Sequence, residues 1–516
     1  MTTPCGGRFF DLNQAHPSGM DGPFDVYCRV FSYPRHLLPP CALGVIISNQ
    51  DPYSLSDLPP DTNDNLPWWK GLTAYHWFVF AMASMAWVFD CLDQQVFILA
   101  RGEALKALLP DGTDGPVINQ YGGYATSILM IGWATGGLIF GAVGDRIGRA
   151  RTLAITVLMY SLCTGLSAFS TSWIDFFIYR FITGMGVGGV FGLAVALVAD
   201  SLPERSRTPA LGLLQALSAF GNITAGLMSI AIGQLGKSGA INPKYGWQIM
   251  FLLGALPAFL CFFIQWRLKE PEKWVKAREE GRMSGVKFGS YMDLLGDPRW
   301  RTSAFGGLLL CIAGVVGVWG IGFFAPELVN GVIELQMKQE NPSVTADEIK
   351  AQQSTFRGIN GIIQNTGAFF GMLAFTFLCQ KIGRKKAFVI GYFAAMAATI
   401  LFFRTFNGFS TIWLSGVMGF CQLALFAGFA VYLPELFPTR LRSTGTSFCY
   451  NVGRYIAATG PITLGELQKR LAPVGSTPEV KLQAFRDACT YMSLFFLIGL
   501  IALLFLPETK DRPLPE

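Results

Sequence analysis

Residues 144–151 read Gly-Asp-Arg-Ile-Gly-Arg-Ala-Arg, and residues 379–386 read Cys-Gln-Lys-Ile-Gly-Arg-Lys-Lys. The second stretch follows the first by 235 positions, and the same shift relates a second pair of motifs. It carries Asp200, Pro203, Arg205 and Arg207 onto Glu435, Pro438, Arg440 and Arg442. Because two separate motifs keep one register, we infer a duplicated chain with two similar halves.

Long apolar stretches run between these motifs. Hydrophobic residues make up 51% of the 516 residues and charged residues only 14%, against roughly 25% charged in soluble domains. About 20 apolar residues in a helix cross a membrane core of ~30 Å. The pattern therefore predicts an all-α membrane protein with twelve transmembrane helices, arranged as two pseudo-symmetric six-helix bundles. The predicted spans are 77–100, 121–143, 152–171, 173–199, 209–235, 247–267, 303–325, 356–379, 387–403, 411–433, 444–464 and 488–506.

The chain divides into five parts on this pattern. Residues 1–70 are rich in Pro and lack sustained periodicity, so we expect a disordered cytoplasmic extension. An upstream start codon that is not used, with Met20 as the internal alternative, would produce the same pattern. The remaining parts are a first bundle at 71–267, a basic cytoplasmic linker at 268–301, a second bundle at 302–507 and a cytoplasmic tail at 508–516.

Lys and Arg are concentrated in the loops after the second, fourth, sixth, eighth and tenth spans. Cytoplasmic loops carry an excess of these residues, so we expect these loops and both termini in the cytoplasm. The net charge of +6 then reflects topology, and no nucleic-acid partner is expected. The 11 Cys form no Cys-x-x-Cys pair and there are only three His, so we predict neither a disulfide framework nor a metal site.

The repeated motifs resemble those of the major facilitator superfamily. Its loop signature is matched by Gly141, Asp145, Arg146, Gly148, Arg149 and Arg151, and its fourth-helix motif by Arg180, Gly184, Gly186 and Gly188. Glu-Pro-Glu-Lys-Trp at 270–274 and Pro-Glu-Thr-Lys at 507–510 look like the sugar porter and metabolite:proton symporter branch. The resemblance covers about residues 75–510 and implies a transporter, not an enzyme. The chain departs from it at Gln380, which replaces the loop Asp, and in span seven, whose lack of paired Gln counts against a sugar.

Asp90, Asp93 and Arg180 lie inside predicted spans, where a charge costs about 2.5–3.5 kcal/mol and calls for a reason. Asp90 and Asp93 share one helix face, and a pair of carboxylates in a low-dielectric site can bind a proton. We expect one of them, by preference the deeper Asp90, to couple transport to protons. The resemblance implies a coupling role for Arg180, with Asp90 as its partner. The alternative is a structural ion pair or a wet outer site.

Arg454 lies midway along the eleventh span, which contains no acidic residue. Its planar donors suit a carboxylate, so we expect it to bind an anionic substrate. Structural pairing with Glu327 or Glu466 is the alternative. Polar and aromatic residues in other spans complete the predicted substrate site, namely Asn451, Tyr455, Gln364, Asn360, Gln422 and Trp87.

The cytoplasmic motifs predict a conformational gate between the halves. We expect Asp145 to pair with Arg205 or Arg207, and Arg149 to approach a helix C-terminus, where the dipole favours a cation. Solvated charge that only sets the topology is the alternative. The predicted gate residues are Gly141, Asp145, Arg146, Gly148, Arg149, Arg205, Arg207, Glu435, Arg440, Arg442, Gly383 and Arg384.

These features predict a secondary transporter that works by alternating access and carries a small organic anion, such as a carboxylate metabolite, together with a proton. We expect no cofactor, because the proton gradient supplies the energy. The expected partners are the substrate and the lipid bilayer, with the chain a monomer in a bacterial inner membrane. A sugar or polyol:proton symporter, a proton-coupled exporter and a non-transporting membrane solute sensor stay open as alternatives.

Overall fold

A computed structural model describes residues 67–516 apart from 111, 114, 458–459, 473–476 and 516. The extension predicted for residues 1–70 therefore lies almost wholly outside the described residues. Pro67–Glu516 forms one compact unit, and the regular structure in its described part is helical throughout. The predicted boundaries between bundles, linker and tail stay predictions.

The first half of the described chain contains five long helices and one interrupted helix. The sixth crossing is broken between α6 and α7 because Pro257 has no N–H to continue the backbone ladder. Two of the long helices begin with capping boxes, at Thr73 and Ser172. The elements are α1 (Ala74–Leu108), α2 (Gly115–Ile147), α3 (Arg149–Ser167), α4 (Trp173–Ser201), α5 (Glu204–Lys237), η1 (Pro243–Tyr245), α6 (Gly246–Gly254) and α7 (Ala258–Arg267).

The linker and the second half follow. The linker is partly helical, since α8 (Glu272–Ser284) and α9 (Tyr291–Gly296) lie within it. The seventh crossing starts as α10, passes through a π-helical turn and a 3₁₀ turn, and resumes as α11 next to Pro326. The elements are α10 (Pro298–Val315), η2 (Val316–Ile321), η3 (Gly322–Phe324), α11 (Ala325–Glu340), α12 (Ala346–Ile382), α13 (Arg384–Thr405), η4 (Phe409–Thr411), α14 (Trp413–Glu435), η5 (Thr439–Leu441), α15 (Arg442–Ala457), α16 (Gly460–Leu471), α17 (Pro478–Met492), η6 (Ser493–Phe495) and α18 (Phe496–Phe505).

Ten helical segments of the described chain are long and apolar enough to cross a membrane. The remaining two predicted spans correspond to α6 with α7, which are only 9 and 10 residues long, and to α15 with α16, which carry many polar side chains. With these two, the described residues contain the twelve predicted crossings. Most helices extend a turn or more beyond the apolar stretch that predicted them, because polar residues form their ends.

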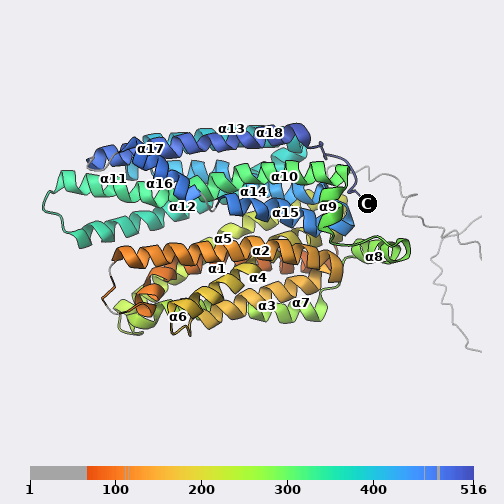
Figure 1. Cartoon of the computed structure of the whole chain (residues 1–516), viewed down its shortest axis with the longest axis horizontal. Helices are drawn as coiled ribbons and strands as arrows, with labels where there is room; N and C mark the ends of the chain where they lie inside the picture. The colour runs from red at the N-terminus through yellow and green to blue at the C-terminus, as the bar shows by residue number, and fades with distance from the viewer. Residues whose placement is uncertain (1–66, 111, 114, 458–459, 473–476, 516) are drawn as a thin grey trace, which may run out of the picture. The chain divides into compact units, whose positions relative to one another are not determined.

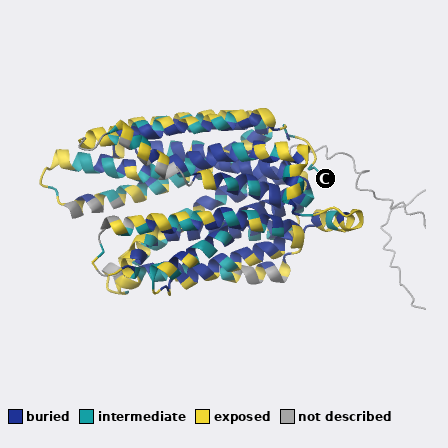
Figure 2. Ribbon diagram, in the orientation of Figure 1, coloured by how far each residue is buried: buried dark blue, intermediate teal, exposed yellow. Residues whose placement is uncertain are grey.

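Helices α1–α7 lie on one side and α10–α18 on the other, with α8 and α9 at one end (Figure 1). Exposed side chains follow the outward faces of the helices, and buried ones gather where the two groups meet, most densely toward the end that carries α8 and α9 (Figure 2). Phe191 of α4 and Tyr450 of α15 stack at this junction with ring centroids 3.8 Å apart. The predicted charged motifs lie at the same end, which we call the inner end.

Candidate functional site: an inner ionic cluster and a central arginine

Asp145, in the last turn of α2, is fully buried against the start of α15 in the opposite half. Its carboxylate accepts hydrogen bonds from the backbone N–H of Ser443 at 3.2 Å and of Thr444 at 2.8 Å, and from the Thr444 hydroxyl at 2.8 Å. A carboxylate at a helix N-terminus is favoured by the helix dipole and satisfies free N–H groups. Asp145 thus joins the two halves.

Asp200, at the end of α4, forms ion pairs with Arg149 of its own half and with Arg442 of the other half. All three side chains are completely buried. Arg149 also donates to Asp145 at 3.3 Å and to the carbonyl of Thr439 at 2.7 Å. A single buried carboxylate therefore holds guanidinium groups from both halves.

The second half contains the counterpart of this pair. Arg384, which corresponds to Arg149 in the 235-residue repeat, donates to both carboxylate oxygens of Glu435 at 3.0 and 2.7 Å. It also crosses to the Thr208 hydroxyl of the first half at 2.9 Å. Gln380 occupies the position equivalent to Asp145. The ion pairs are thus repeated, whereas the carboxylate on a helix N-terminus belongs to the first half.

Gly148 and Gly383 precede α3 and α13 with φ of +120° and +93°. Glycine adopts these values without the strain that a side chain would bring. A Cβ at Gly148 would also run into the carboxylate of Glu270, and one at Gly383 into that of Glu508. The two motif glycines are therefore explained by their backbone conformation and by the carboxylates packed against them.

Glu270 and Glu508 cap the helices that follow these glycines. Glu270 accepts the N–H groups at the start of α3 at 2.7–3.2 Å. Glu508 accepts those of Arg384 and Lys385 at 2.9 and 3.0 Å. Burial acts to raise the pKa of Glu508, but these and two further backbone N–H groups outweigh it, so its pKa lies below the usual value. Both acidic motifs after the sixth and twelfth crossings thus work as helix caps.

Other predicted gate residues have different partners from those expected. The prediction that Asp145 pairs with Arg205 or Arg207 is wrong, because Arg207 donates to the carbonyl of Ala199 at 3.1 Å and pairs with Glu204 at 3.6 Å. Arg205 lies at the start of α5. The reason is that the N–H groups of Ser443 and Thr444 at the start of α15 already satisfy the Asp145 carboxylate.

Two further predicted gate residues form contacts with the linker. Arg146 donates to the carbonyl of Phe288 at 3.3 Å, and Arg440 pairs with Asp293 at 2.9 Å. Tyr291 of α9 donates to the carbonyl of Leu138 at 2.6 Å, and burial raises the pKa of its hydroxyl. Gly141 packs on α15, where a Cβ would overlap Ser447. The linker therefore contacts both halves at the inner end.

Arg180 of α4 lies fully buried within the first half. It donates to the hydroxyl of Ser167 at 2.6 Å and to Thr164 at 3.4 Å, and Thr164 in turn donates to Asp93 at 2.5 Å. The structure therefore links Arg180 to Asp93 through Thr164, which corrects the expected pairing with Asp90. Three phenyl rings surround its guanidinium, those of Phe97, Phe176 and Phe251.

Arg454 of α15 lies between two aromatic rings at the junction of the halves. Its guanidinium carbon is 4.0 Å from the ring centroid of Trp133 and 4.2 Å from that of Tyr450. One terminal nitrogen donates to the Tyr450 carbonyl at 2.8 Å and to the Asn451 side chain at 3.0 Å. Arg454 is 1% exposed and forms no ion pair with a described residue.

Asp90 is an acidic residue within electrostatic range of Arg454. It is fully buried, and the charge of Arg454 acts on it electrostatically. One of its oxygens accepts from Gln94 at 3.2 Å, and the other has no hydrogen-bond partner among the described residues. Asp90 and Asp93 thus have different hydrogen-bond partners, Gln94 and Thr164, although the two carboxylates still act on each other electrostatically.

The predicted substrate residues divide into two sets. Asn451 contacts Arg454, and Trp87 packs with tilted rings against Phe191 at 5.1 Å between centroids. Phe191 in turn stacks on Tyr450. Tyr455 shares a 2.8 Å hydrogen bond with Thr135 across the halves. Gln422 lies elsewhere, because its amide donates to Thr399 at 2.6 Å inside the second half.

Asn360 and Gln364 lie one turn apart on α12, where Asn360 is buried and its Oδ1 has no partner among the described residues. No contact in the described structure joins them to Arg454. Sequence reasoning assigned no role to Thr164, Ser167 and Thr444, whose hydroxyls carry no charge signal. It also left Tyr450 unnoticed, although its spacing of four residues from Arg454 places both on one helix face.

Comparisons with known proteins agree with this architecture. The chain is 26% identical to a Haemophilus influenzae protein named for metabolite transport, over 86% of this chain and 99% of that relative. It is 26% identical to the cis,cis-muconate transport protein of Acinetobacter baylyi, over 80% of this chain and 94% of that relative. The solved structure of the proton:xylose symporter XylE superposes with a TM-score of 0.63 at 21% identity, covering 86% and 98% of the two chains.

The family model for the Major Facilitator Superfamily matches residues 115–461, which is well over half of the chain. That range contains both copies of the repeated inner motifs, together with Arg180 and Arg454. The named relatives are transporters and not enzymes. The chain is therefore an integral membrane transport protein that belongs to the Major Facilitator Superfamily.

Proposed function

We propose that this transporter carries a small organic anion together with a proton, and that Arg454 binds the anion. The observation that carries the proposal is the state of Arg454, a buried guanidinium at the junction of the halves with no carboxylate in ion-pair contact among the described residues. Its Nε has no hydrogen-bond partner there. Arginine does not lose its proton, so a desolvated guanidinium with a free donor favours an anionic ligand.

Asp90 supports a direct mechanism of coupling. When Asp90 is ionised, its negative charge offsets the charge of Arg454 and weakens the attraction for an anion. When Asp90 is protonated, the positive charge of Arg454 is left for the substrate. Proton and anion therefore favour each other's binding, which is the thermodynamic requirement for symport. Asp93 is linked through Thr164 to Arg180 and not to the proposed substrate arginine, so we assign the coupling proton to Asp90.

The aromatic residues around Arg454 suit a small, flat organic anion. Trp133 and Tyr450 flank the guanidinium, and Trp319 of the second half packs against Trp133 at 5.7 Å. Such rings give apolar contact area beside one polar anchor, as small-molecule sites commonly do. A relative named for cis,cis-muconate transport is consistent with a carboxylate substrate.

The inner ionic cluster supports alternating access. We use this name for the buried side chains of Asp145, Asp200, Glu435, Arg149, Arg384 and Arg442. Asp145, Asp200 and Arg442 join the halves at the inner end, and opening that end must separate them. We infer that the described state is closed on the inner side and that this side is cytoplasmic, with both termini there. A bacterial inner membrane and a monomeric state complete the proposal.

Uptake into proteoliposomes tests the anion site. Purified protein is given a panel of radiolabelled carboxylates and sugars under an imposed pH gradient. We expect uptake of a carboxylate, its loss in Arg454→Ala, and partial uptake in Arg454→Lys, which keeps the charge but not the fork of donors. Arg404→Ala is the matched control, because Arg404 is half-exposed and pairs with Asp487 on the second half. Unchanged anion uptake in Arg454→Ala would refute the assignment.

Exchange measurements test the coupling residue. Asp90→Asn mimics the protonated carboxyl, so we expect it to abolish uphill uptake while exchange of internal for external substrate continues. Glu334→Gln, in an exposed pair with Lys338, serves as the control. Uphill uptake that survives in Asp90→Asn, or in the presence of a protonophore, would remove Asp90 from the mechanism. Uptake of a neutral sugar, export, or binding without flux would instead favour the alternatives.

A further inference from the structure

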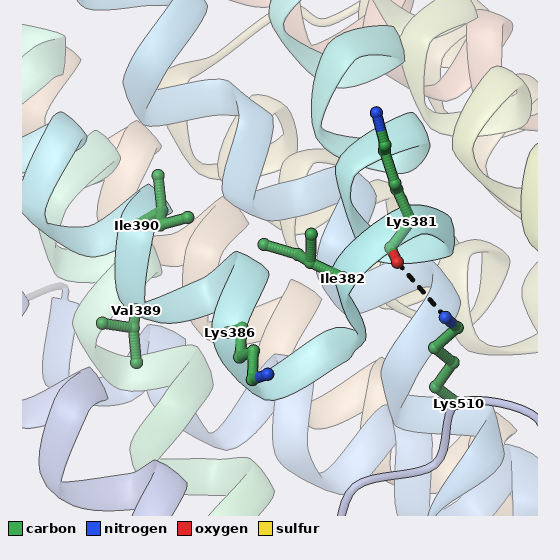
Figure 3. A pocket seen from close by; sticks show the side chains of 6 residues that line it. All are labelled: Lys381, Ile382, Lys386, Val389, Ile390 and Lys510. Carbon is green, nitrogen blue, oxygen red and sulfur yellow. Dashed lines mark hydrogen bonds between the residues drawn. The ribbon is translucent and has the colours of Figure 1, made fainter.

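A cavity of about 650 Å³ lies at the inner end of the second half, beside the Glu508 cap of α13. It is lined by the last turn of α12, the first turns of α13 and the segment after α18 (Figure 3). The lining residues are Lys381, Ile382, Lys386, Val389, Ile390 and Lys510. Lys386 and Lys510 thus share one hollow with three aliphatic side chains, whereas Lys381 turns its carbonyl to Lys510 and its ammonium toward the ring of Phe377.

The three lysines are poorly neutralised by the described protein. Lys510 donates to the carbonyl of Lys381 at 3.2 Å, as Figure 3 shows, and lies 3.7 Å from Asp511, whose side chain is 82% exposed. Lys381 and Lys386 form no ion pair with any described residue. The like charges of Lys386 and Lys510 at one hollow repel each other, so the site favours an anion.

An exposed apolar stripe leads away from the lysines along α13. Val389 is 39% exposed, Ile390 51% and Phe393 49%, and these positions follow Lys386 at spacings of three, four and seven residues. That spacing places them on one helix face. In a membrane protein such a face lies against acyl chains, and lysines at its end lie at the level of the headgroups.

The first half lacks this combination. The repeat carries Lys381 and Lys386 onto Arg146 and Arg151, but Arg146 is engaged by the carbonyl of Phe288 in the linker. Counting from the equivalent caps Glu270 and Glu508, the position of Lys510 is held by Glu272. This cluster of lysines beside an apolar stripe therefore belongs to the second half and is not a general product of the duplicated motif.

We propose that this cavity binds the headgroup of one anionic phospholipid, with the phosphate between Lys386 and Lys510 and an acyl chain along Val389, Ile390 and Phe393. A soluble phosphate would use the lysines but would leave the apolar stripe without a role. Basic pockets at the cytoplasmic side of membrane helices are suited to such headgroups. The site is independent of the substrate proposal.

Lipid binding counted by native mass spectrometry tests this inference. Delipidated protein in detergent is titrated with phosphatidylglycerol or with zwitterionic phosphatidylcholine. We expect one phosphatidylglycerol to bind more tightly than the rest, and the K381Q/K386Q/K510Q variant to lose at least tenfold in affinity for it. K269Q/K276Q/K287Q removes the same charge from exposed linker positions and should bind as the wild type does. Phosphatidylcholine should show no such dependence.

Two further arms keep the test decisive. Ile390→Ser should weaken phosphatidylglycerol binding while leaving all lysines in place, and the single variant K386Q stands in if the triple variant fails to fold. Equal retention of phosphatidylglycerol by the wild type and the triple variant overturns the proposal. So does an equal loss in the linker control, which would reduce the effect to net charge. Displacement of the lipid by millimolar inorganic phosphate would identify a free-anion site instead.

Discussion

Replacing Asp200 by Asn should open the inner end of the transporter. The substitution removes the buried negative charge with which Arg149 and Arg442, both fully buried, form ion pairs. Arg149 keeps Asp145 at 3.3 Å, so Arg442 suffers most of the loss. Removing one partner of a buried pair costs about 3–5 kcal/mol. We take the lower figure, about 3 kcal/mol, because Arg442 also donates to backbone carbonyls.

Opening the inner end relieves this penalty, because Arg442 then returns to water. A change of about 3 kcal/mol shifts the closed-to-open ratio roughly 100-fold toward the open state. Ser447 reports the change, since it is fully buried on α15 against Gly141 and Gly192 of the first half. A cysteine at 447 should react with a membrane-impermeant thiol reagent only when the halves separate at this end.

The assay compares the labelling rate of Ser447→Cys with and without Asp200→Asn, after subtracting the rate of the protein without the added cysteine. We expect a rise of tenfold or more from the inner side. Glu204→Gln is the control, because Glu204 is 64% exposed and lies in the same region. A rate within twofold of the parent in Asp200→Asn, or an equal rise in the control, would show that Asp200 does not hold the halves together.

Three further substitutions test other parts of the structure. Glu508→Gln should lower the Tm at pH 7. Because the pKa of folded Glu508 lies below its usual value, its capping is lost only as the pH falls through that lower pKa, so the Tm difference from the wild type should persist through the ordinary titration range of glutamate and close below it. Gly188→Ala should cost about 1–3 kcal/mol, since its Cβ would overlap the backbone of α2 at Trp133, whereas Gly233→Ala meets no atom within 4 Å and should melt no lower than the wild type. Gln422→Met should lower the Tm slightly and leave the KM for substrate within twofold, because the Gln422 amide donates to Thr399 inside the second half. A tenfold higher KM would show that Gln422 contacts the substrate.

The membrane fold was predictable because apolar runs and the 235-residue repeat are both visible in the sequence. The repeat also indicates which charges meet, since Arg149 with Asp200 and Arg384 with Glu435 occupy equivalent positions. The partner of Asp145 was not predictable from charge, because backbone N–H groups of α15 take the place of a cationic side chain. Every residue except proline has a backbone N–H, so such a donor cannot be recognised from residue types. The prediction from charge therefore named Arg205 or Arg207 and was wrong.

The central site shows a similar limit. Asp90 and Asp93 are close in sequence and act on each other electrostatically, but their side chains have different hydrogen-bond partners, Gln94 for Asp90 and Thr164 for Asp93. Thr164, which bridges Asp93 and Arg180, is one of many hydroxyl residues in the spans and gave no signal. Single polar residues such as Gln422 are equally ambiguous, because an interhelical hydrogen bond and a substrate contact need the same amide.

The inner ionic cluster contains three arginines, Arg149, Arg384 and Arg442, and three acids, Asp145, Asp200 and Glu435. Its sum of charges is therefore zero. The first half supplies Arg149, Asp145 and Asp200 and the second half Arg384, Arg442 and Glu435, so the two halves carry −1 and +1 as they separate. The membrane voltage acts on charge displaced across the bilayer. The cluster therefore contributes to the electrical work only as far as the halves move along the membrane normal, and a voltage dependence of inner opening would report that movement.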